Sequence, residues 1–166
     1  CEKAVKDLGI TSLRNISVAE FKSRKSEMDE TTYIRALHAV TEMERVIAAV
    51  KALRAEDFKT FGKIVSSAHE SLRDNYTVSC PELDLAVATA NSNGALGARM
   101  IGGGFGGSAI AFVKSEDLEP IKEKIKQAFD GDKQKLRKQE EYFEWVFKDR
   151  EEQSQKDAIS FISNLN

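Results

Sequence analysis

The amino-acid sequence predicts a helix-rich α+β fold, and three observations carry that prediction. The chain has 166 residues, 41 % of them hydrophobic and 31 % charged, enough for one domain with its own core and too few for two comfortable ones. Apolar residues recur at roughly helical spacing through most of the chain. Only one strand–loop–strand unit is clear, around the glycine-rich stretch Gly97 to Gly107. We therefore expect helices to dominate over one small sheet.

Two short helices are predicted near the N-terminus. Residues 1–8 resemble the end of a helix, and Gly9 stands where a glycine stops one. Ser17 and Glu20 have the spacing of a capping box, which predicts the start of another short helix. Because the first residue is cysteine rather than methionine and enters a helix at once, we expect the chain to be a piece of a longer one.

Two longer helices follow. The first is predicted from about Glu30 to Arg54 by the spacing of Ile34, Leu37, Val40, Val46, Ile47, Val50 and Leu53. Asp57 begins the second, whose apolar face carries Phe58, Phe61, Ile64, Val65, Ala68 and Leu72. His38 lies within the first helix and His69 beside the apolar face of the second. We expect both histidines to be packed or hydrogen-bonded scaffold residues, because a lone helical histidine is more often that than a catalyst.

The segment Ser71 to Tyr76 is an unusual polar cluster at the end of an apolar-faced helix. It could bind a substrate hydroxyl or a phosphate. It could equally be a solvated helix end in which Arg73 and Asp74 satisfy backbone groups, and the chemistry of these residues favours that interpretation.

The next helix is predicted by Ser79 as its capping serine, with Pro81 in the first turn and Glu82 at the third position. It ends at Asn91 to Gly94, before the two strands that flank the glycine run.

Ser115 is predicted to cap a further helix, which Gly131 stops. Beyond it the composition changes to lysine, arginine, glutamate and glutamine with sparse apolar residues. We therefore expect two parts, a domain over residues 1–131 and a charged helical tail over 132–166. The tail carries four aromatic residues: Tyr142, Phe143, Trp145 and Phe147. They could form a partner-binding face, but the favoured interpretation is a stripe that docks the tail helix on the domain.

The glycine run suggests a loop that touches a phosphate or another anionic group. Five glycines occupy the six positions Gly102 to Gly107, broken only by Phe105, which exceeds what a hairpin turn needs. The alternative is a tight turn in which glycine only relieves steric strain. Gly102, Gly104 and Gly107 formally fit a dinucleotide-binding pattern, but a strand follows where that pattern requires a helix. No Walker A ending and no protein-kinase motifs accompany the run.

Charge and cysteine content exclude several classes of function. The net charge is −2 with both signs interspersed, so we expect no nucleic acid and no anionic membrane as a partner. Cys1 and Cys80 make neither a metal-binding pattern nor a disulfide framework, which favours a reducing, cytoplasmic location. No signal peptide is evident, and no apolar run is long enough to span a bilayer.

Three motifs in order carry a resemblance to a known family. They are the segments His69 to Tyr76, Ser79 to Asp84 and Gly97 to Gly107. Together they resemble the C-terminal half of galactokinases, a branch of the GHMP kinase family whose third, glycine-rich signature is the last of these motifs. Arg35, His38 and Glu42 also match that family. The resemblance covers roughly residues 1–129.

The resemblance implies a fold, an activity and a site. It implies a C-terminal GHMP-kinase domain with a ferredoxin-like plait, complete or incomplete, and ATP- and Mg²⁺-dependent phosphorylation of galactose at its C1 hydroxyl. The glycine run would form a wall of the active-site cleft close to substrate and phosphates: Gly102, Gly103, Gly104, Phe105, Gly106 and Gly107. Arg73, Asp74 and Arg99 would support it. The catalytic aspartate and the main phosphate loop belong to the N-terminal half, so this chain would hold no catalytic residue and no metal site.

The sequence departs from the family at Asn75, Ile101 and Ser108, where aspartate, threonine and cysteine are usual. A larger departure is the charged tail, where the family closes its sheet with further strands. Two other functions stay open: a non-catalytic sugar or nucleotide sensor that binds a protein partner, and a structural module without ligand. Within the kinase class, mevalonate- or homoserine-type members are the alternative to galactokinase, which the first two motifs favour.

Overall fold

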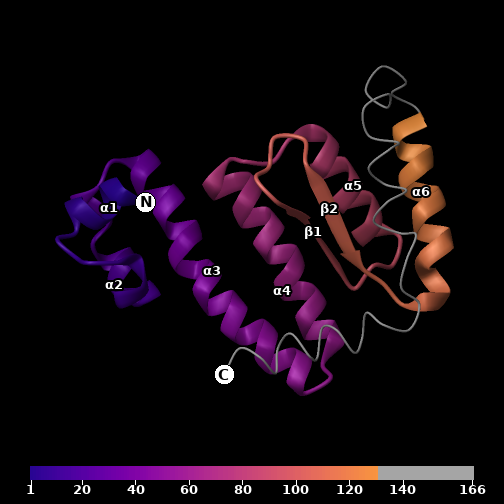
Figure 1. Ribbon diagram of the computed structural model, residues 1–166, viewed down its shortest axis with the longest axis horizontal. Coiled ribbons are helices and arrows are strands. Elements are labelled where there is room, and N and C mark those ends of the chain that lie inside the picture. The colour runs from indigo at the N-terminus through magenta and orange to yellow at the C-terminus, as the bar shows by residue number, and fades with distance from the viewer. Residues whose placement is uncertain (131–166) are drawn as a thin grey trace. The chain divides into compact units, whose positions relative to one another are not determined.

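Six α-helices and one antiparallel hairpin make up residues 1–130, the part of the chain that the computed structural model describes (Figure 1). The elements are α1 Glu2–Asp7, α2 Val18–Ser23, α3 Glu30–Arg54, α4 Phe58–Ser71, α5 Pro81–Ser92, β1 Gly97–Ile101, β2 Ser108–Phe112 and α6 Leu118–Asp130. Short 3₁₀ turns lie at Leu13–Asn15, Lys25–Glu27 and Ser115–Asp117, and a π-helical turn at Leu72–Tyr76. The predicted helix-rich α+β class is confirmed. The predicted tail over 132–166, its aromatic stripe and the stop at Gly131 lie outside the described residues.

Most predicted helix starts are correct, because each rests on a local hydrogen bond that the sequence encodes. The Ser17 side chain accepts a hydrogen bond from the Glu20 N–H, as a capping box requires. Asp57 accepts from the Thr60 N–H at the start of α4. Gly9 follows α1 with a φ of +62°, the left-handed conformation in which glycine ends a helix.

Two predicted caps are wrong. At α5 the N-cap position belongs to Cys80, and Pro81 is the first helical residue, so Ser79 lies one position too early. Its hydroxyl donates to the side chain of Asp84 instead. Ser115 lies inside a 3₁₀ turn that precedes α6, and Lys114 precedes that turn without a side-chain capping bond. At Ser79 the side chain has a local alternative to capping, and at Ser115 a 3₁₀ turn precedes the helix; a spacing rule registers neither.

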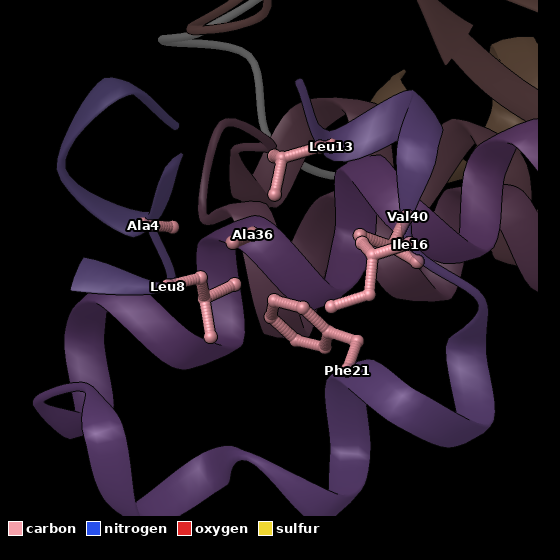
Figure 2. Packing of buried hydrophobic residues seen from close by; sticks show 7 residues of the cluster. All are labelled: Ala4, Leu8, Leu13, Ile16, Phe21, Ala36 and Val40. Carbon is pink, nitrogen blue, oxygen red and sulfur yellow. The ribbon is translucent and has the colours of Figure 1, made fainter. Parts of the chain in front are cut away.

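One hydrophobic cluster joins α1 and α2 to the first half of α3 (Figure 2). Its buried members are Ala4, Leu8, Leu13, Ile16, Phe21, Ala36 and Val40. Phe21 is fully buried, and its ring stacks on Tyr33 with 5.4 Å between ring centroids. Burial of this apolar surface ties the N-terminal segment to the long helix.

A second cluster lies under the hairpin. Leu72, Leu83 and Met100 are buried together, which places α5 against one face of the sheet. In the register of the hairpin, Gly97 pairs with Phe112 and Ile101 with Ser108. Alternation along the strands therefore puts Met100 on the covered face and its neighbours on the opposite one.

Helix α4 crosses the outer edge of β1 at very short range. Gly62 and Gly97 meet backbone to backbone, and a Cβ added to either would collide with the carbonyl of the other segment. Two side chains of α4 accept hydrogen bonds from the strand: Ser66 Oγ from the Ala98 N–H at 3.3 Å, and His69 Nδ1 from the Met100 N–H at 3.2 Å. The edge amides of β1 are thus bonded to side chains of a helix, which protects the edge from pairing with another strand.

Candidate functional site

The glycine loop connects β1 to β2 and holds an unusual series of left-handed residues. Gly102, Gly104 and Gly106 have φ values of +78°, +82° and +102°, and Phe105 between them has +57°. A non-glycine residue with such a φ is uncommon, and a side chain at this position carries strain. The side chain of Phe105 is 77 % exposed.

The loop is seated on the carbonyl of Val78. The Phe105 N–H donates to that oxygen at 2.9 Å. Gly104 passes so close to Val78 that an added Cβ would collide with the same carbonyl and with the Val78 side chain. By contrast, nothing lies within 4 Å of a Cβ added at Gly103, whose φ is not left-handed. Gly104 is therefore required by close approach as well as by conformation.

Val78 itself is placed by the π-helical turn. Its N–H donates to the Leu72 carbonyl at 3.1 Å, and Thr77 before it adopts a left-handed φ of +59°. A β-branched residue in that conformation is an outlier. Single π turns inside helices are frequent at functional sites. No sequence pattern indicates Val78, because its backbone carbonyl, not its side chain, makes the contact.

A buried polar network stabilises the same turn. Asn75 Nδ2 donates to Ser71 Oγ at 3.1 Å, and Ser71 Oγ lies 3.0 Å from His38 Nδ1. The His38 ring lies 4.9 Å from the Tyr76 ring. Burial lowers the pKa of His38, and the carboxylate of Glu42 only partly opposes this effect. His38 is therefore a neutral, packed residue, as predicted. The asparagine at position 75 acts as a donor, a role that an ionised aspartate could not fill.

Arg73 and Asp74 lie at the surface and bind each other. Arg73 Nε and Nη2 donate to the two Asp74 oxygens at 2.7 and 2.9 Å. The prediction that they satisfy backbone groups at the helix end is wrong, because a side-chain partner lies one residue away. Arg73 also lines a hollow of about 190 Å³ between α4 and α5 that includes His69 and Asp84. A supporting role for Arg73 and Asp74 at the glycine loop stays a prediction.

Arg99 joins the hairpin to α3. Its Nη1 lies 2.8 Å from Glu42 Oε1, and the other oxygen of Glu42 accepts from Arg45 at 2.6 Å. Burial alone would raise the pKa of Glu42, but the hydrogen bonds and charges of Arg99 and Arg45 outweigh it and lower that pKa. Arg99 is thus held by a carboxylate, and this ion pair ties β1 to α3.

His69 connects three elements. Its Nδ1 accepts from β1, and its Nε2 lies 3.1 Å from Asp84 Oδ1 of α5, although the N–H does not point straight at that oxygen. Burial lowers the pKa of His69, and Asp84 opposes this only in part. This confirms the prediction of a scaffold histidine. Its partners lie on separate elements, so no local pattern could reveal them.

Two classes of site find no support in the described residues. Within residues 1–130, no group of three or more His, Cys, Asp or Glu side chains is placed to hold a metal ion. None of the helices in that range is both long and apolar enough to cross a membrane.

Comparison with known families identifies the domain. Residues 49–131, half of the chain, match the family model described as GHMP kinases C terminal. The chain belongs to the GHMP kinase family. This GHMP kinase domain is 42 % identical over 131 residues to a galactokinase of Streptomyces coelicolor and 37 % identical over 132 residues to one of Bos taurus. These alignments cover 78 % and 79 % of the chain but 34 % of each relative, so the chain spans about a third of their length.

A solved structure agrees with the fold of this GHMP kinase domain. Lactococcus lactis galactokinase complexed with galactose superposes with a TM-score of 0.76 at 38 % identity, covering 78 % of this chain and 35 % of that one. The resemblance to the C-terminal part of galactokinases, including the glycine-rich signature, is confirmed.

Proposed function

We propose that the chain is the C-terminal domain of a galactokinase-like sugar kinase, which phosphorylates galactose at its C1 hydroxyl with ATP. Its share of the work is to supply the glycine-rich wall of the active-site cleft. The observation that carries this proposal is the glycine loop of Gly102 to Gly107, strained and seated on Val78 in a domain that resembles galactokinases. Such a reaction requires ATP, and we infer a cytoplasmic location from that requirement.

The chemistry divides between this domain and the rest of such a kinase. Phosphoryl transfer depends on positioning the nucleophile and stabilising charge with metal ions and cationic groups. Open space lies where a side chain would stand at three glycines of the loop: Gly102, Gly103 and Gly106. An anionic ligand could therefore approach the backbone N–H groups of the loop closely. Residues 1–130 offer no cluster of metal ligands. We infer that Mg²⁺, the catalytic aspartate and the main phosphate loop belong to the preceding part of the kinase.

The test is complementation. The chain is co-expressed with the part of the Streptomyces coelicolor galactokinase that precedes the matched region, and galactose-dependent ADP release is measured. We expect turnover from the pair and none from either part alone. Galactose-dependent ADP release by this chain alone would contradict the division of roles. A folded pair without turnover would contradict the proposed function.

Two glycine substitutions test the role of the loop in the active pair. Gly104→Ala forces a Cβ against the Val78 carbonyl at a positive φ, and we expect at least roughly a hundredfold loss in kcat/KM, typical of a misplaced catalytic wall. Gly103→Ala leaves the seat of the loop intact, because its Cβ meets open space, and it tests instead whether a ligand needs that space. Unaltered activity of Gly104→Ala would exclude a dependence of catalysis on the seating of the loop.

A further inference from the structure

The second half of α3 exposes apolar side chains along one face. Ile47 and Val46 are 72 % and 55 % exposed, although both lie well inside a 25-residue helix. Met43 and Val50 beside them are partly buried. The four residues follow the spacing i, i+3, i+4 and i+7, by which one helix packs on another. We call this face the α3 stripe: Met43, Val46, Ile47 and Val50.

Helix α4 leaves the α3 stripe uncovered. It packs against α3 (Figure 1), and Ala52, which lies on the side of α3 opposite the stripe, is 6 % exposed. The stripe thus lies on the side that faces away from Ala52. Single exposed apolar residues need no explanation, but a stripe with helix-packing spacing marks an interaction surface.

The charges beside the stripe indicate what covers it. Glu44 precedes Ile47 by three residues and Lys51 follows it by four, so the two charges lie on the same flank of the helix, on either side of the stripe's centre. Both side chains are exposed, and within residues 1–130 neither forms an ion pair. A negative charge at one end and a positive charge at the other make the stripe complementary to an inverted copy of itself.

Antiparallel packing of two copies of α3 satisfies both the apolar and the charged residues. With a two-fold axis between Val46 and Ile47, these two residues of one copy lie opposite Ile47 and Val46 of the other. Met43 then lies opposite Val50 of the second copy. Glu44 lies near Lys51 of the second copy, and because helical side chains lean toward the N-terminus of their own helix, these two lean toward each other.

We propose that the α3 stripe is a self-association surface, through which two copies of this chain pair as antiparallel helices. The interface is isologous, because the same stripe serves both copies. One helix face is small beside the roughly 1,600 Å² of a typical stable complex, so the pair is weak and forms as the concentration rises. The stripe includes no residue of the glycine loop, so pairing does not depend on the proposed kinase function.

Sedimentation equilibrium of the full chain measures the pairing. We expect a monomer–dimer equilibrium whose dissociation constant rises at least roughly tenfold in Ile47→Lys, because a charge then lies at the apolar centre of the interface. Leu85→Gln is the matched control, because it alters an exposed leucine on α5, and we expect it to leave the equilibrium unchanged. Melting temperatures measured on dilute, monomeric samples should be the same for both variants and the unaltered chain.

A charge swap tests the antiparallel arrangement. Glu44→Lys and Lys51→Glu each place like charges side by side across the interface, so we expect either change to weaken pairing roughly threefold or more at low ionic strength. The double variant brings opposite charges together again and should restore pairing. Failure of the double variant to recover would overturn the proposal.

Three further outcomes would also overturn it. The first is a chain that stays monomeric up to roughly 1 mM, or that pairs equally well with Ile47→Lys. The second is a lower melting temperature of monomeric Ile47→Lys, which would assign the stripe to a contact within the chain. The third is failure of Ile47→Lys to form a complex with the preceding part of the Streptomyces coelicolor galactokinase, which would assign the stripe to that part.

Discussion

His69 shows how a single neutral side chain holds several elements of this fold together. Because Nδ1 accepts a hydrogen bond from the Met100 N–H, the proton of the neutral ring is on Nε2, which faces Asp84. A second proton would have to be placed on Nδ1, opposite an N–H that can only donate. The Met100 bond would then be lost, and a cation would stand in a buried position.

This arrangement predicts a loss of stability in weak acid. Burial lowers the pKa of His69 in the folded chain, with Arg73 and Arg99 adding to the effect and Asp84 opposing it. The unfolded histidine titrates near 6.5. The unfolded state therefore binds more protons below that pH, so stability is complete above about pH 6.5 and falls as the pH drops toward the native pKa. The slope is at most about 1.4 kcal/mol per pH unit for each such histidine.

Urea unfolding at pH 7.5 and 5.5 measures the effect. His69→Gln keeps an acceptor but does not titrate, so we expect a smaller difference between the two pH values than in the unaltered chain. His38→Gln serves as a comparison, since burial lowers the pKa of His38 in the same direction. An identical pH dependence in His69→Gln and the unaltered chain would contradict the assignment.

At the scale of elements, α4 and β1 cross with their backbones in direct contact. Gly62 sits in the middle of a helix, where alanine would ordinarily be favoured by about 1 kcal/mol. Here a Cβ would collide with the Leu96 carbonyl, and backbone cannot move aside as a flexible side chain can. The higher helix propensity of alanine and the collision of its Cβ therefore act in opposite directions on stability at position 62, and the collision has the larger effect.

We expect Gly62→Ala to lower the free energy of unfolding by roughly 1–3 kcal/mol, as overpacking does. The neighbouring Lys63→Ala, at an exposed position of the same helix, should change it by no more than about 0.5 kcal/mol. Hydrogen exchange gives a local readout, because separating α4 from β1 would expose the amides of Ala98 and Met100. A higher free energy of unfolding for Gly62→Ala would contradict this expectation and would show that α4 can move away from β1 without loss of stability.

Elements governed by local signals were predictable from the sequence, and contacts between elements were not. The bounds of α3 agree with the prediction of about Glu30 to Arg54, because helical spacing is a local signal, and Asp29 caps the helix where that spacing begins. The two strands around the glycine run were found for the same reason. The seat of that loop on Val78 joins residues 27 positions apart through a backbone carbonyl, so no side-chain pattern encodes it. The predicted cap at Ser79 is wrong because its hydroxyl bonds Asp84, and the one at Ser115 is wrong because a 3₁₀ turn precedes α6.

At the scale of the whole domain, α3 connects two separate cores. Its first half carries the cluster around Phe21 (Figure 2), and its second half lies beside α4 (Figure 1), which in turn holds the hairpin. Twenty-five helical residues span about 37 Å, so α3 is long enough to link them as one rigid rod. Residues 1–125 form one compact unit. We therefore expect both cores to unfold together.

Phe21→Ala tests that cooperativity. Phe21 is fully buried, and its truncation should cost about 3–5 kcal/mol. Hydrogen exchange should then show faster opening at the β1 amides as well as in the first half of α3. Leu85→Ala, at an exposed position, is a control expected to change little. Unaltered protection of β1 in Phe21→Ala would mean that the two cores unfold independently.

The edge contact of α4 has a consequence for how copies of this domain could aggregate. A two-stranded sheet ordinarily has two free edges, and a chain with two sticky edges can propagate into a fibre. Within residues 1–130, the Ser66 and His69 side chains bond the outward amides of β1, which leaves the side of β2 as the edge that another strand could pair with. Two copies that meet through β2 would use up that side on both partners. For residues 1–130, edge-to-edge association through β2 would therefore stop at a pair.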